Sequence, residues 1–127
     1  MARLFNVEIF NKLINKSTNY YSDVQFNELL GSADSVILQV IVDAVAGADT
    51  VTAQHQVSND GSPTSGLWTN TSAAPAVSPA TSTDVPKASM ARTASTDPMG
   101  AFGRVQVSCT TQNGVAVRVI ACGRTDV

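Results

Sequence analysis

Residues 104–121 alternate between apolar and polar side chains, and this period of two constrains the fold more than any other feature of the chain. In the first run, Val105, Val107 and Cys109 share one face, and residues 115–121 carry valine or alanine at every odd position. Successive side chains of a β-strand point to opposite faces of the sheet. Each run therefore predicts a strand with one buried face.

Residues 112–114 separate the two runs and predict a hairpin turn. A three-residue loop ending in Gly114 brings the two apolar faces together and pairs Cys109 with Val117, whereas a two-residue turn would mix the faces. Gly114 is then expected in the left-handed conformation. This register puts Cys109 and Cys122 on opposite faces of one sheet, so we expect no disulfide between them.

Residues 36–42 are apolar at nearly every position, which is typical of a central strand buried on both faces, although a buried helix also fits the run. The β-branched residues, with Gly31 and Gly47 beyond the ends, favour the strand. Residues 50–57 alternate again, with His55 on the apolar face. We predict a second hairpin between these two runs.

The N-terminal third of the chain permits more than one interpretation. Residues 3–16 fit either a helical stripe or a strand, and both stay open. Residues 22–25 have the form of a helix capping box, with Gly31 as a stop signal. Residues 20–30 also place apolar side chains at alternate positions, however, and we favour a strand there.

Residues 71–101 differ in composition from the rest, because 23 of the 31 are Ala, Ser, Thr, Pro or Gly. Prolines exclude regular structure from most of the segment. Such a composition buries too little surface to order itself, and a structureless connection of this length is uncommon in a compact domain. We expect an extended irregular loop that is ordered by another protein chain.

The length of 127 residues suits one domain. We expect an antiparallel β-sandwich of jelly-roll or Ig-like type, with an N-terminal arm over residues 1–19 and an extended loop over residues 71–101. Only 14% of the residues are charged, against about 25% in typical soluble domains, which favours a protein packed against neighbours.

A formal net charge of −2 and a pI near 5.1 predict no binding to nucleic acid. The N-terminus does not resemble a signal peptide, and no apolar stretch approaches the roughly 20 residues that cross a membrane. We therefore expect a soluble, cytosolically made protein without a membrane partner.

Three features between residues 51 and 68 invite a chemical interpretation. His55 could be a base or a metal ligand, but neither role has partner residues in the sequence, and a buried histidine is favoured. Residues 59–61, Asn-Asp-Gly, supply one carboxylate where a calcium loop needs several, so we predict a turn. Trp68 could stack on a sugar, but a tryptophan that caps the end of the sandwich core is favoured.

The remaining candidates are weaker. Residues 61–66 do not form a nucleophile elbow, and residues 100–103 do not match a phosphate-binding loop. The acidic residues form no visible pair for glycoside hydrolysis; those considered are Asp23, Glu28, Asp34, Asp43 and Asp49. We predict no catalytic residue, no cofactor and no metal site, and we expect a protein that is not an enzyme.

Four short motifs occur in an order that resembles a known group. They are residues 21–23 (Tyr-Ser-Asp), 33–36 (Ala-Asp-Ser-Val) leading a long strand, 56–61 (Gln-Val-Ser-Asn-Asp-Gly) and Trp68. The order is similar to small β-sandwich structural proteins of tailed bacteriophages, over roughly residues 20–68 and 102–124. Members of that group include capsid decoration (cement) proteins. The 71–101 insert departs from their compact pattern.

The resemblance implies a viral structural protein that binds the major capsid protein on the virion surface and stabilises the shell. It also implies a homo-oligomer, with a trimer as the leading case. Two alternatives stay open: a carbohydrate-binding or adhesion module that uses Trp68, and a self-assembling shell or coat subunit.

Overall fold

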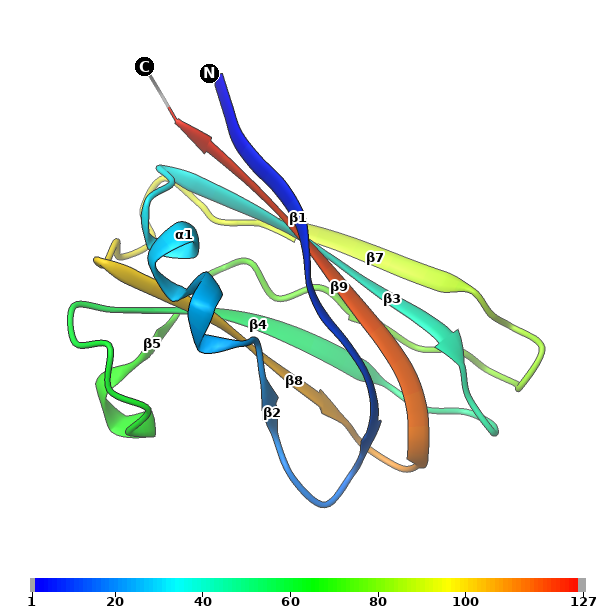
Figure 1. Cartoon of the computed structure of the whole chain (residues 1–127). Helices are drawn as coiled ribbons and strands as arrows, with labels where there is room; N and C mark the ends of the chain where they lie inside the picture. The colour runs from blue at the N-terminus through cyan, green and yellow to red at the C-terminus, as the bar shows by residue number, and fades with distance from the viewer. Residues whose placement is uncertain (1, 126–127) are drawn as a thin grey trace.

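The chain folds into two antiparallel β-sheets that pack face to face (Figure 1). The computed structural model describes residues 2–125, apart from the side chains of Ala2 and Ser65. Sheet A has the strand order β1-β9-β3-β7, and sheet B has the order β2-β8-β4-β5, with the short β6 also paired to β4. The predicted all-β sandwich is confirmed.

The strands of sheet A are β1 (Ala2–Asn15), β9 (Asn113–Thr125), β3 (Ser35–Ala44) and β7 (Lys87–Arg92). Those of sheet B are β2 (Tyr20–Tyr21), β8 (Phe102–Cys109), β4 (Val51–Ser58), β5 (Thr69–Asn70) and β6 (Ala76–Val77). Three short helical segments connect them: η1 (Val24–Phe26), α1 (Asn27–Gly31) and η2 (Ser65–Leu67).

The core lies between the inner faces of the two sheets and follows the alternation in the sequence. In β3, every second residue from Val36 to Val42 is at most 2% exposed. β8 and β9 contribute inner residues of the same kind, namely Val105, Val107, Cys109, Val115, Val117, Val119 and Ala121. Burial of one such valine or leucine contributes about 1.5–3 kcal/mol, so a register slip of one residue would be strongly unfavourable.

The segment after β2 is helical, and the strand expected over residues 20–30 was wrong. The Asp23 side chain accepts a hydrogen bond from the backbone N–H of Gln25, which is the capping interaction indicated by the alternative interpretation. Leu30 of α1 is 1% exposed and packs against β8 at Gly103. A Cβ on Gly103 would lie 2.7 Å from the Leu30 Cβ, so the helix approaches the sheet this closely only because the residue is glycine.

Both predicted hairpins were wrong in their pairing, although their strands were placed correctly. β8 pairs with β4 and β2, while β9 pairs with β1 and β3, so the 110–112 connection crosses between the sheets. The connection from β3 to β4 crosses in the same way. Gly114 does adopt a positive φ of 71°, and both cysteines are free, as expected.

The expected N-terminal arm over residues 1–19 is corrected by β1. This strand runs antiparallel to β9 from the pair Ala2–Thr125 to the pair Asn15–Asn113. Ile9, Phe10 and Ile14 are buried in the shared core. Residues 2–15 are therefore an edge strand of sheet A, and the strand alternative for residues 3–16 holds. Residue 1 of the arm lies outside the described residues.

The irregular loop expected over residues 71–101 is corrected in part, because the segment contains β6 and β7, while its ordering by another protein chain stays a prediction. Backbone N–H groups of Asp49, Ala53 and His55 donate to carbonyls spaced along residues 73–79, so this part of the segment extends beside β4. Further on, β7 pairs with β3 and completes sheet A. Small residues and prolines fit here because an edge needs hydrogen bonds along one side only.

Candidate functional site

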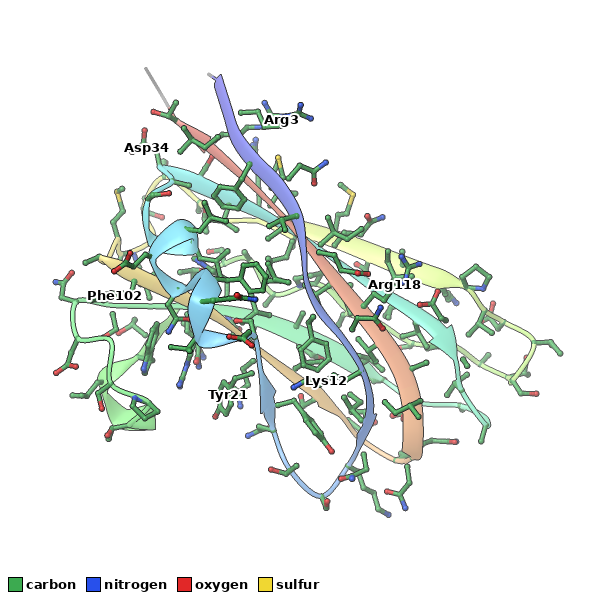
Figure 2. The ribbon with its side chains drawn as sticks, in the orientation of Figure 1. Arg3, Lys12, Tyr21, Asp34, Phe102 and Arg118 are labelled. Carbon is green, nitrogen blue, oxygen red and sulfur yellow. The ribbon has the colours of Figure 1, made fainter. Side chains whose placement is uncertain are left out.

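The outer face of sheet B carries an arginine between two aromatic rings. The Arg104 Cζ lies 4.3 Å from the ring centroid of Tyr21 and 4.4 Å from that of Trp68. Tyr21 projects from β2 beside β8 (Figure 2). Trp68 is held by a 2.8 Å hydrogen bond from its Nε1 to the Ser62 carbonyl. The aromatic faces attract the guanidinium through their quadrupoles.

Arg104 is only 6% exposed, and its polar contacts are few. Its Nε donates to the Gln56 Oε1 at 2.8 Å, and no other hydrogen bond or ion pair of its side chain is found among residues 2–125. Burial lowers the pKa of Arg104, and the nearby Tyr21 opposes the shift. The group stays protonated at ordinary pH, so sheet B holds a largely buried cation that has no acidic partner within residues 2–125 and whose Nη atoms still reach solvent.

A pocket of about 360 Å³ opens beside this arginine. Tyr21, Trp68 and Arg104 line it, together with Val24 and Asn27. Val24 is 73% exposed, so the rim is apolar. The side-chain Oδ1 of Asn27 is buried without a hydrogen-bond partner. We call this feature the Arg104 pocket.

His55 faces the core, as predicted. Thr71 Oγ1 forms a 2.9 Å hydrogen bond with His55 Nδ1 and also lies 3.3 Å from the His55 carbonyl oxygen. The other ring nitrogen, Nε2, is buried without a partner among the described residues. Burial lowers the pKa of His55 to about 4, against a weaker opposing effect of Asp97.

The acidic residues serve structural contacts. Asp43 binds Arg118 of β9 (Figure 2) with an Nε to Oδ2 distance of 2.6 Å, and this hydrogen bond lowers the Asp43 pKa. Burial opposes ionisation of Asp49, but its pKa is still lowered by hydrogen bonds from Thr50, Thr110 and Thr111. Within the part of the chain that the structure describes, no cluster of His, Cys, Asp and Glu could hold a metal ion.

The other sequence candidates are placed as follows. Asp60 Oδ1 accepts from the Ser62 N–H and Asn59 Oδ1 from the Ala101 N–H, which confirms a turn at residues 59–61. Trp68 is 8% exposed, but it lies on the outer face of sheet B and not in the main core, because its ring covers Arg104. The sequence reasoning did not single out Arg104. The only indication of Arg104 in the sequence is that it occupies a polar position in the alternating pattern of residues 104–121.

The outer face of sheet A carries a second feature, centred on Gln39 of β3. Its cross-strand neighbours are Ile120 of β9 and Met90 of β7, while Ile37 and Ile41 flank it on the same face of β3. Met90 is 61% exposed, and the three isoleucines are partly exposed. We call these five residues the outer patch. Four large apolar side chains surround one uncharged amide there.

Comparisons with known proteins give no relative for this chain. No family model matches it, and neither a curated protein nor a solved structure does so. Among the described residues, no helix is long and apolar enough to cross a membrane.

Proposed function

We propose that the chain is a viral structural protein, a capsid decoration (cement) protein that binds and stabilises a phage shell through protein–protein contacts. The outer patch is the observation that carries this proposal. Its place on a rigid sheet suits a contact surface that forms without rearrangement. The major capsid protein is the proposed partner, and the virion surface is the proposed location.

The sequence of β3 is typical of a strand buried on both faces. The chain itself buries only one of them: Leu38 and Val40 are fully buried, whereas Ile37 and Ile41 stay partly exposed. Solvent-facing positions of an antiparallel sheet are ordinarily polar. A partner that covers the outer patch would complete the burial that the sequence of β3 indicates.

The charges around the outer patch favour a protein partner. Arg118 is paired with Asp43 and lies within 3.8 Å of Glu8, whereas Arg92, opposite Ile37, has no ion pair among the described residues. Exposed pairs of this kind contribute little to stability. An apolar centre with a polar rim is the usual composition of a protein–protein contact.

Co-sedimentation with empty shells of the encoding virus tests this proposal. Wild-type protein is expected to pellet with the shells, and Met90→Glu is expected to weaken binding about tenfold or more, since it puts a charge into the contact. Met99→Glu is the matched control, because Met99 is similarly exposed at 65% and lies outside the outer patch. Equal effects of both variants would contradict the role of the patch, and absence of wild-type pelleting would contradict the function.

The native mass of the pure protein separates the alternatives. A small discrete oligomer, with a trimer as the leading case, supports a decoration protein. A megadalton particle would instead identify a shell subunit. A monomer that binds glycans and loses that binding in Trp68→Ala would identify an adhesion module, although the contact of Trp68 with Arg104 leaves less ring surface for a sugar.

A further inference from the structure

We propose that the Arg104 pocket is a docking site for a carboxylate side chain, Asp or Glu, of a partner protein. That the partner is a capsid protein rests on the proposed function. The carboxylate chemistry does not, because it follows from the arginine and its surroundings alone.

Most of the hydrogen-bond donors of Arg104 have no partner within residues 2–125. A guanidinium has five N–H groups, and only the Nε–H has a partner among the described residues, the Gln56 Oε1. The four N–H groups on Nη1 and Nη2 are left without one, and Arg104 lines the pocket. Neither Nη atom is a buried unsatisfied atom, so these donors reach solvent at the pocket. They are therefore free to bind an anionic acceptor that enters it.

The neighbours of Arg104 fix the orientation of its guanidinium group. Tyr21 and Trp68 contact the guanidinium with their rings, and Gln56 holds its Nε edge. These contacts fix the plane of the group and leave its Nη edge as the accessible side. A carboxylate matches that edge, because its two oxygens accept two parallel hydrogen bonds in the guanidinium plane.

The apolar rim of the Arg104 pocket favours a protein segment over a free anion as its ligand. Val24 is 73% exposed and Tyr21 is 37% exposed, and the exposed Pro63 also lines the pocket. A free anion would gain nothing from these apolar groups. An acidic residue flanked by apolar neighbours would cover them while its carboxylate reaches Arg104, an arrangement typical of interface arginines and aromatic residues.

Trp68 is the only tryptophan in the chain, so its fluorescence reports directly on this pocket. The experiment titrates the full chain with N-acetyl-aspartate methylamide and its glutamate counterpart at constant ionic strength. The uncharged asparagine analogue and inorganic phosphate are the comparison probes. We expect saturable quenching by a carboxylate probe at about millimolar concentration, with no saturation by the asparagine analogue.

Two variants refine the test. Arg104→Gln is expected to weaken binding of the carboxylate probe about tenfold or more. Arg104→Lys keeps the charge but loses the planar fork, so an intermediate loss is expected. Arg3→Gln is the matched control, since it removes the same charge from an exposed site at the terminal end of sheet A (Figure 2). Thermal melts establish that each variant is folded.

The proposal is overturned if the carboxylate probes do not saturate with wild-type protein, or if phosphate binds as well as they do. It is also overturned if the folded Arg104→Gln variant retains full affinity. Shell co-sedimentation is scored separately. Pelleting without carboxylate binding would remove the pocket proposal alone, and carboxylate binding without pelleting would remove the capsid function alone.

Discussion

Acidification from pH 7 to pH 5 is expected to destabilise the fold through a single side chain, His55. The pKa of His55 is about 4 in the folded chain, against an ordinary value of 6.5. The cause is burial, since the ring is 2% exposed and a proton added at Nε2 would have no hydrogen-bond acceptor among the described residues. Between pH 6.5 and pH 4 the unfolded chain therefore binds this proton and the folded chain does not.

The magnitude follows from the difference between the two pKa values. One unit corresponds to about 1.4 kcal/mol, so the complete effect is about 3 kcal/mol. The contribution is present above pH 6.5 and is lost as the pH falls, with about 2 kcal/mol lost between pH 7 and pH 5. For a chain of this length, that loss lowers the Tm by about 8 °C.

The assay is a series of thermal melts at pH 7, 6 and 5, at constant ionic strength, for wild type and His55→Asn. Asparagine can still donate to Thr71 Oγ1, but it cannot titrate. The variant is expected to start less stable and to lose little further stability over this range. The chain has one histidine, so its native pKa can also be read directly from the imidazole resonance by NMR.

Two results would refute this reasoning. One is a native imidazole that titrates near pH 6.5. The other is an equal fall in Tm for wild type and His55→Asn, which would assign the acid sensitivity to other groups.

Two further substitutions test the packing and the turn contacts. Gly103→Ala is expected to destabilise the fold by about 1–3 kcal/mol in chemical denaturation, because its Cβ would lie 2.7 Å from the Leu30 Cβ. Gly66→Ala meets no atom within 4 Å and should change the free energy of unfolding by less than about 0.5 kcal/mol, so similar losses in both would contradict the close approach. Asp49→Asn should cost about 1–3 kcal/mol at pH 7, since Asp49 Oδ1 accepts hydrogen bonds from Thr50, Thr110 and Thr111. The cost should shrink in melts below pH 3.8, where the unfolded Asp49 is protonated, and a cost independent of pH would show that its charge is unimportant.

The sequence predicted which residues face the core, but not which strands lie side by side. Alternation assigns Val107 and Val117 to buried faces whether their strands pair in one sheet or oppose each other across the core. The strand pairing depends on contacts between distant segments, such as β1 with β9 and β7 with β3. The small side chains of residues 71–101 did not indicate that part of the segment extends along β4. Backbone hydrogen bonds to β4 order that part, and they leave no pattern in the sequence.

The Arg104 pocket shows the same limit at the level of a site. The alternation placed Arg104 on the outer face of its strand, and that placement is correct. The ring of Tyr21 reaches it from β2, and the ring of Trp68 reaches it from the position just before β5; both are distant in sequence. A period of two carries no information about such neighbours.

The pairing of β1 with β9 also determines how the sandwich responds to force. Ala2 lies opposite Thr125, and Figure 1 shows the start of β1 and the end of β9 side by side. A pulling force between Ala2 and Thr125 acts perpendicular to the strands, so it breaks the hydrogen bonds between β1 and β9 one pair at a time. The sandwich is therefore mechanically weak against a pull between Ala2 and Thr125.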